Sequence, residues 1–246
     1  MSFSAKPYLR SVSVDPAASL DFDTYPFSIP AVRDLGVLEM HPDVTFFVGE
    51  NGAGKSTVLE AIAVAMGLPA EGGPRSVLRE QQAVSPLQRH LKVVKGFRQA
   101  RHAYFLRAES MFNVFSYMDE VGGARRSGRG LHQRSHGEAF FELLQGFEKG
   151  GFYLLDEPEA ALSPNRQLAA LCMIDALVKD GAQFIIATHS PILLAYPNAR
   201  IHSFDKSGIS QVAYEDTEHY ATTRDFLNHY PRRLEQLLGD APDVQS

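Results

Sequence analysis

The sequence predicts an α/β fold with a mostly parallel central sheet and flanking helices. Short apolar runs rich in β-branched and aromatic residues alternate with longer segments of helical periodicity, which is typical of strands joined by crossover helices. The chain has 246 residues, of which 44% are hydrophobic and 22% charged, enough for one large globular domain or two small ones. Two of the apolar runs end in polar residues, at the strand ends where open α/β sheets bind ligands.

The sequence excludes several classes of protein. Cys172 is the single cysteine, so neither an intrachain disulfide nor a thiolate zinc finger can form, and we expect a reducing, cytoplasmic location. The first twenty residues contain no apolar run of signal-peptide length. No run of about eighteen apolar residues predicts a membrane-spanning helix.

The expected elements follow from hydrophobic periodicity and from glycine and proline positions. In the first part of the chain they are a strand at 45–48, a helix at 55–66, an irregular arm at 69–101, a strand at 103–106, a helix at 110–118 and a flexible basic loop at 122–130. In the second part they are a helix at 136–147, a strand at 152–155, a helix at 164–179 capped by Ser163, a strand at 184–187, short strands at 201–204 and 209–212, and polar helices to about 238.

A glycine-rich loop lies between the first predicted strand and helix. Its residues match the pattern G-x-x-x-x-G-K-[ST] and are Gly49, Glu50, Asn51, Gly52, Ala53, Gly54, Lys55 and Ser56. Backbone N–H groups of such a loop wrap phosphates, and the following helix directs its positive dipole end at them. We expect Lys55 to neutralise the β- and γ-phosphates and the Ser56 hydroxyl to bind Mg²⁺. A glycine turn without function is the alternative, which the strand–loop–helix context disfavours.

Two further apolar strands end in candidate catalytic residues. Asp156 and Glu157 follow one strand, where Asp156 would hold Mg²⁺ through water and Glu157, on the other side of the strand, would activate the attacking water. A helix cap is the alternative interpretation of this pair. His189 follows the next strand, where it would contact the γ-phosphate or position the water, although a lone histidine is more often structural.

Positive charge is concentrated in residues 88–134. This segment has ten lysines and arginines against three acidic residues, a net charge of +7, and leaves −12 on the rest of the chain. A solvated basic face is the simpler interpretation, and a surface that binds nucleic-acid phosphates or a partner is the alternative.

These motifs occur in an order that resembles the ABC-type ATPases. The order is the phosphate loop through Thr57, a signature at Ser135, His136, Gly137 and Glu138, the acidic strand at 154–158, a dimer loop at 160–163 and the switch histidine His189. The chain is similar to transporter nucleotide-binding domains and to the heads of chromosome-maintenance and repair ATPases. It most resembles compact stand-alone bacterial proteins described as AAA-family ATPases.

The resemblance implies a single ABC-type ATP-binding domain over residues 1–246, with an arm and signature subdomain at about 69–148. It implies that two protomers sandwich two ATP molecules with Mg²⁺, each ATP held by the phosphate loop of one chain and the signature of the other. Ser135 and Gly137 would then contact the γ-phosphate across the dimer. This chain departs from the usual signature at Arg134 and His136, where leucine and glycine are common, and Glu138 replaces a glutamine.

For two elements of the family pattern, the sequence does not decide which residue takes the role. The glutamine that follows the arm strand is absent, and Arg107 or Glu109 either substitutes for it or is a surface charge. The aromatic residue that stacks on adenine is Tyr25 or Phe27, unless both are packing residues. Near the C-terminus, Asp216, Glu218 and His219 are interpreted as capping and solvated residues of a helix start rather than as a metal site.

The sequence therefore predicts an Mg²⁺-dependent ATPase that dimerises around ATP and couples closure and reopening to an unidentified partner. Two alternatives are an ATPase associated with nucleic acid through the basic segment and the ATP-binding subunit of a membrane transporter. The missing glutamine, the Glu138 signature and the basic arm argue against the transporter and make a membrane partner less favoured.

Overall fold

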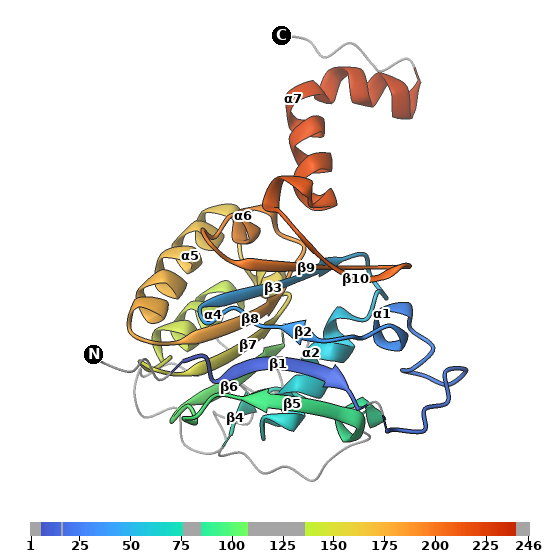
Figure 1. Ribbon diagram of the computed structural model, residues 1–246. Helices are drawn as coiled ribbons and strands as arrows, with labels where there is room; N and C mark the ends of the chain where they lie inside the picture. The colour runs from blue at the N-terminus through green and yellow to red at the C-terminus, as the bar shows by residue number, and fades with distance from the viewer. Residues whose placement is uncertain (1–5, 16, 76–84, 108–135, 240–246) are drawn as a thin grey trace.

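The computed structural model describes residues 6–15, 17–75, 85–107 and 136–239 (Figure 1). A seven-stranded sheet has the order β10-β9-β3-β8-β7-β6-β4. Its strands are β3 (Val44–Gly49), β4 (Gly73–Pro74), β6 (Ala103–Arg107), β7 (Phe152–Asp156), β8 (Gln183–Ala187), β9 (Arg200–Asp205) and β10 (Gly208–Val212). Neighbouring strands from β9 to β6 pair in parallel, and β10 and β4 are antiparallel edges. The predicted fold class is confirmed.

The central strands are apolar on both sides because both faces of the sheet are covered. Helices α4 (His136–Gln145), α5 (Pro164–Lys179) and α6 (Pro191–Leu194) cover one face (Figure 1). Helices α1 (Pro30–Arg33) and α2 (Lys55–Ala65) cover the other. In β3, Phe46 packs on the face covered by α4, α5 and α6, and Phe47 packs on the face covered by α1 and α2, as the alternation of a strand requires.

A second, three-stranded antiparallel sheet lies over α2 and was not predicted from the sequence. Its order is β2-β1-β5, formed by β2 (Leu38–Glu39), β1 (Leu9–Val14) and β5 (Leu91–Lys95). The prediction of an irregular arm at 69–101 is therefore wrong for β5 and for the short 3₁₀ helix η1 (Pro86–His90), whose Leu87 is fully buried. β5 pairs with a strand about eighty residues away, and only that partner makes its short, lysine-rich sequence a strand.

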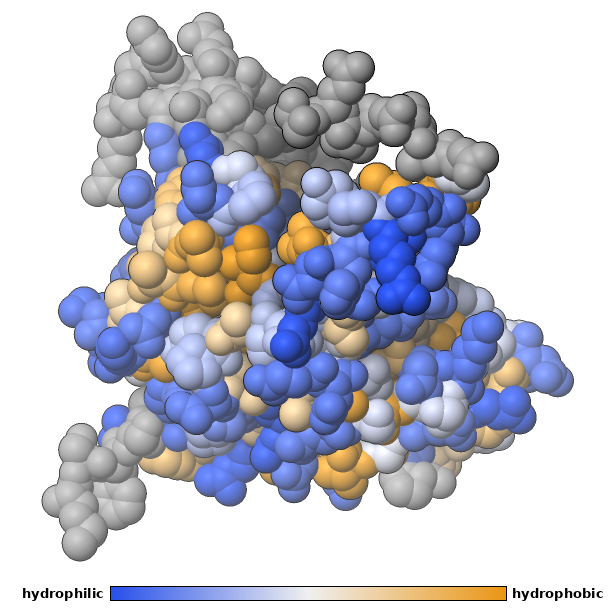
Figure 2. Space-filling view, turned by 90° about the horizontal axis from the view of Figure 1, so that it is seen from above, coloured by the Kyte–Doolittle hydropathy of each residue, from blue (hydrophilic) through white to orange (hydrophobic). Residues whose placement is uncertain are grey.

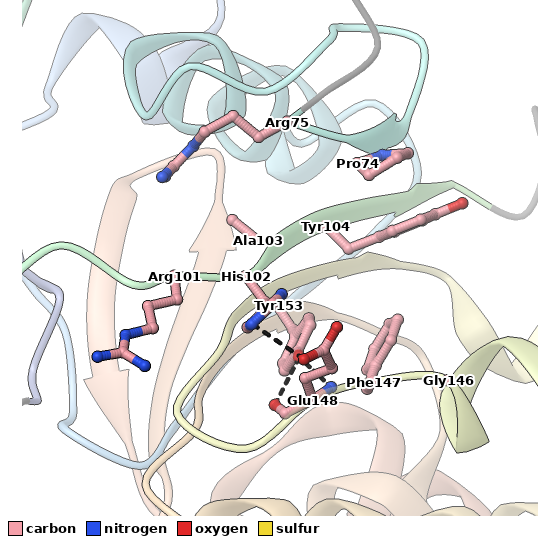
Figure 3. Close-up of a pocket in the computed structure, with 10 residues that line it drawn as sticks. All are labelled: Pro74, Arg75, Arg101, His102, Ala103, Tyr104, Gly146, Phe147, Glu148 and Tyr153. Carbon is pink, nitrogen blue, oxygen red and sulfur yellow. Dashed lines mark hydrogen bonds and ion pairs between the residues drawn. The ribbon is translucent and has the colours of Figure 1, made fainter.

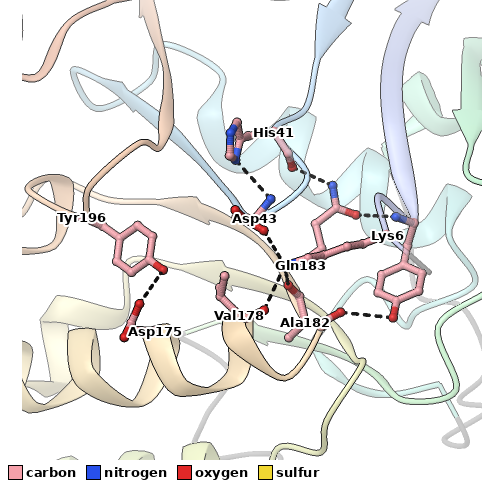
Figure 4. A network of polar contacts seen from close by, with 10 residues as sticks. Lys6, His41, Asp43, Asp175, Val178, Ala182, Gln183 and Tyr196 are labelled. Atoms are coloured by element: carbon pink, nitrogen blue, oxygen red, sulfur yellow. Dashed lines mark hydrogen bonds and ion pairs between the residues drawn. The ribbon is translucent and has the colours of Figure 1, made fainter. Parts of the chain in front are cut away.

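Gln183, the first residue of β8, connects the seven-stranded sheet to the second sheet (Figure 4). Its Oε1 accepts from the backbone N–H groups of Tyr8 and Leu9, and its Nε2 donates to the carbonyl oxygens of Leu9 and His41, all at 2.8–3.0 Å. Close by, the Lys6 ammonium pairs with Asp43. Since Gln183 is fully buried, all four bonds replace lost water contacts.

Replacing Gln183 with leucine should lower the free energy of unfolding by at least about 3 kcal/mol, because buried backbone groups that lose their partners cost roughly 1–3 kcal/mol each. Equilibrium urea denaturation measures the change. The matched control is Gln211→Leu on the exposed surface of β10, which should shift stability by no more than about 0.5 kcal/mol. Equal stability of the two variants would show that the Gln183 bonds contribute little.

Most other predicted elements are confirmed, including the helix at 164–179 with unchanged bounds. Ser163 occupies its N-cap position, but its side chain makes no capping hydrogen bond, so that part of the prediction is wrong. The helix expected at 110–118 and the loop at 122–130 lie outside the described residues.

The last described helix, α7 (Glu218–Leu238), projects from the body of the molecule (Figure 1). It bends at His229, whose φ of −132° is not helical, two residues before Pro231. Its exposed large apolar side chains are Phe226, Leu227, Tyr230, Leu237 and Leu238. Seen from above, the described surface is mostly hydrophilic with a group of apolar side chains (Figure 2). Within the described ranges, no helix combines the length and apolar character needed to span a bilayer.

Candidate nucleotide-binding site

The phosphate loop turns from β3 into α2, as its glycine pattern predicts. At its start Gly49 has φ +139°, and a Cβ there would lie 2.1 Å from the carbonyl oxygen of Phe204, so no other residue fits. Gly54 is the left-handed N-cap residue of α2, and no side chain caps this helix. The N–H groups of the first turn are therefore available to phosphate oxygens, at the positive end of the helix dipole.

Lys55 is buried beneath the loop. Its Nζ donates to the carbonyl oxygens of Gly49 at 2.7 Å and Glu50 at 2.9 Å, bonds that phosphate oxygens could replace. Burial lowers the pKa of the Lys55 ammonium, and the nearby carboxylates, Glu157 first among them, oppose this shift. Among the described residues, the hydrogen-bond acceptors of this buried cation are two carbonyl oxygens, and such a cation attracts an anionic ligand.

Ser56 and Asp156 come together at the end of β7. The Ser56 hydroxyl donates to the Asp156 carboxylate at 2.9 Å. Hydroxyl and carboxylate oxygens are ligands that Mg²⁺ prefers, so these two residues fit the predicted metal site. Arg107 lies beside them, with its Nε 3.6 Å from Asp156 and its guanidinium 2.9 Å from Glu60. Of the two candidates for the missing glutamine, Arg107 reaches this site and Glu109 lies outside the described residues.

Glu157 and His189 face each other across the ends of β7 and β8. Glu157 Oε1 lies 3.5 Å from His189 Nε2. Glu157 is not a strand residue, so the strand alternation used to orient it does not apply. Its φ and ψ of 51° place it in the left-handed region, which is rare outside glycine and frequent at functional sites. Burial, followed by the charge of Lys55, lowers the pKa of His189, so the imidazole is neutral at pH 7.

Glu159 is a third carboxylate of the site and was not predicted from the sequence. It lies in the 3₁₀ helix η4 (Pro158–Ala161) and accepts from the Thr188 hydroxyl at 2.7 Å and from the backbone N–H of His189 at 2.5 Å. Burial raises its pKa. It therefore fixes the backbone that carries His189. Its position two residues after Glu157 was the available signal.

His219 was also missed as a site residue. The interpretation of Asp216, Glu218 and His219 as capping and solvated residues is wrong for His219. The N-cap residue of α7 is Thr217, and the His219 ring contacts His189. His219 Nε2 lies 2.9 Å from His189 Nδ1. No sequence spacing predicts this contact, since thirty residues and two strands separate the histidines.

The aromatic candidates for adenine stacking differ in exposure. Phe27 is buried and packs edge-on against His90, so it is a packing residue. Tyr25 is 65% exposed, and its hydroxyl lies 3.3 Å from the Thr57 hydroxyl directly behind the phosphate loop. Of the two candidates, Tyr25 is therefore the one whose ring is exposed next to the phosphate loop.

The signature can be placed only in part. α4 begins at His136, so the backbone of His136, Gly137 and Glu138 forms its first turn, which agrees with the helix expected at 136–147. Ser135 lies outside the described residues, and so does the part of the basic segment from 108 to 134.

A cavity of about 280 Å³ lies at the other end of the strands (Figure 3). It is lined by the end of β4 and by residues that precede or begin β6 and β7. Among these are His102, whose Nε2 pairs with Glu148 at 2.9 Å, and the stacked rings of Phe147 and Tyr153. None of the predicted nucleotide-binding or catalytic residues lines it.

Comparison with known proteins agrees with this fold. A family model described as an AAA domain matches residues 26–121, less than half of the chain. The structure of an SMC head bound to the C-winged helix domain of ScpA has a TM-score of 0.51 at 14% identity, covering 84% of this chain and 98% of that one. CbiO1 from Clostridium perfringens, part of the ABC transporter complex cbiONQ, has a TM-score of 0.51 at 16% identity, covering 93% and 99%. No curated protein matches the sequence.

The fold and the phosphate loop define a P-loop domain of the α/β class. More narrowly, the chain has the fold of ABC-type and SMC-type ATPase domains, and the resemblance indicated by its motifs is confirmed. At this low identity the likeness establishes the fold, and the chemistry depends on the residues of the site.

Proposed function

We propose that the protein binds and hydrolyses ATP with Mg²⁺ in a homodimer closed around two nucleotides. One observation carries the proposal: Lys55, Ser56, Asp156, Glu157 and His189 meet at the carboxyl ends of β3, β7 and β8 and at the start of α2. Cation, hydroxyl, carboxylate and imidazole are the groups that phosphoryl transfer to water requires.

Each group has a defined part in the reaction. Lys55 and the first N–H groups of α2 hold the β- and γ-phosphates, and bound Mg²⁺ would supply charge neutralisation next to Ser56 and Asp156. Glu157 accepts a proton from the attacking water. His189 donates a hydrogen bond from Nε2 to the γ-phosphate. Its Nε2 is buried beside the Glu157 carboxylate at 3.5 Å, so an N–H there points into the space that the γ-phosphate and the attacking water would share.

The test is phosphate release from ATP by the full chain. Turnover should depend on Mg²⁺ and disappear with EDTA, and light scattering should show ATP-dependent dimers. A chain that neither hydrolyses ATP nor binds it in a calorimetric titration would contradict the proposal.

Tyr25 is the residue that we propose to stack on adenine, because it is exposed next to Thr57. Tyr25→Ala should raise the Kd for ATP about tenfold, since one base–aromatic stack contributes roughly 1–3 kcal/mol. Tyr25→Phe keeps the ring and should stay within about twofold of wild type. Calorimetry with ATP and with tripolyphosphate separates the base from the phosphates: an equal loss for both ligands would place Tyr25 outside the base site.

A further inference from the structure

The two histidines at the site form a directed pair. His189 Nδ1 and His219 Nε2 are 2.9 Å apart, so one ring donates and the other accepts. Their rings are tilted by 57° at a centroid distance of 5.0 Å, which is a hydrogen-bonding rather than a stacking arrangement. Burial is the main cause that lowers the pKa of each ring, and each therefore carries one proton at neutral pH.

The surroundings decide which ring donates. On its far side, His189 Nε2 faces the Glu157 carboxylate at 3.5 Å. A lone pair at Nε2 would point at this anion, whereas an N–H there is attracted to it. The proton of His189 therefore lies on Nε2, Nδ1 is the acceptor, and His219 donates from its own Nε2.

His219 is held in place by the start of α7. The Thr217 hydroxyl donates to the carbonyl oxygen of Tyr214 at 2.7 Å and caps α7 through the N–H of Tyr220. The Tyr214 hydroxyl in turn donates to the carbonyl oxygen of Pro191, two residues after His189. The first turn of α7 is thus attached to the loop that carries His189, although most of the helix beyond it is exposed.

We propose that His219 is a positioning residue of the ATPase reaction, which keeps His189 in the tautomer that presents Nε2–H to the γ-phosphate. The inference depends on the proposed ATPase function for its kinetic consequence, but the tautomer of His189 can be measured without turnover. Through His219, the C-terminal helix α7 becomes part of the catalytic site.

The direct test is nitrogen NMR of the full chain labelled at histidine, with His189→Ala used to assign the His189 signals. The ¹⁵N shifts should identify the Nε2–H tautomer of His189 in the wild type and a mixture of tautomers in His219→Leu. An Nδ1–H tautomer in the wild type would overturn the proposal, whatever the activity.

The kinetic test compares two substitutions of His219. His219→Leu removes the donor and should lower kcat about 10- to 100-fold at unchanged KM, the range found when a partner that orients an imidazole is lost. His219→Gln places an amide N–H near the former Nε2 and should recover most of this loss. In a His189→Ala background, His219→Leu should have no further effect, because the two residues act as a unit.

The matched control is His229→Leu on the exposed part of α7, which should keep wild-type kcat. Wild-type turnover in His219→Leu, or equal losses in the leucine and glutamine variants, would show that His219 does not position His189. Failure of the ATPase proposal looks different, because the wild type itself would then have no turnover while its tautomer stayed measurable.

Discussion

Replacing Glu157 with glutamine should lower kcat for ATP hydrolysis at least about 100-fold, the scale typical of losing a general base. Glutamine keeps the size and the hydrogen-bonding reach of the side chain but cannot accept the proton of the attacking water. Binding of MgATP should persist, because in the proposed site the phosphates contact Lys55 and the first turn of α2 rather than Glu157. The proposed closed dimer should then accumulate, since hydrolysis is the step proposed to reopen it.

Phosphate release and size-exclusion chromatography with ATP measure the two effects. Glu39→Gln is the matched control, since Glu39 is an exposed carboxylate that pairs with Arg200 far from the phosphate loop. It should leave both turnover and oligomeric state unchanged. A Glu157→Gln chain that stays monomeric with ATP and hydrolyses it at nearly the wild-type rate would remove Glu157 from the role of base.

The sequence predicted those parts of the site that local chemistry determines. Gly49 and Gly54 are required by backbone conformation, Lys55 and Ser56 follow them at fixed spacing, and Asp156 ends an apolar strand. In each case the reason for the residue lies within a few positions of it, so a motif can represent it.

The parts that were missed depend on contacts between distant segments. β5 becomes a strand by pairing with β1, and Gln183 is fixed by backbone groups more than 140 residues away. His219 acquires its role only because β9 and β10 return the chain to His189. Periodicity cannot report such contacts, because nothing in the local pattern distinguishes His219 from a solvated residue.

The proposed dimer makes a prediction that a single-chain site does not. In a two-fold symmetric dimer, each site combines the phosphate loop of one chain with the signature of the other. Lys55→Ala should abolish tight ATP binding by removing the cation under the phosphate loop, and Ser135→Arg should drive a bulky cation into the γ-phosphate contact. Each variant alone should therefore have almost no activity.

Mixing these two variants should restore activity. In a mixed dimer one site contains both substitutions and the other contains neither. With random pairing about half of the dimers are mixed and each has one intact site, so turnover should reach about a quarter of wild type if the sites are independent. Mixing Lys55→Ala with Glu157→Gln is the control, because both residues belong to the same half-site and every mixed dimer keeps two damaged sites. Recovery in the first mixture alone locates the signature across the dimer interface. A Ser135→Arg homodimer with wild-type turnover would instead make residues 134–138 an ordinary helix start, because a site that used Ser135 could not tolerate arginine there.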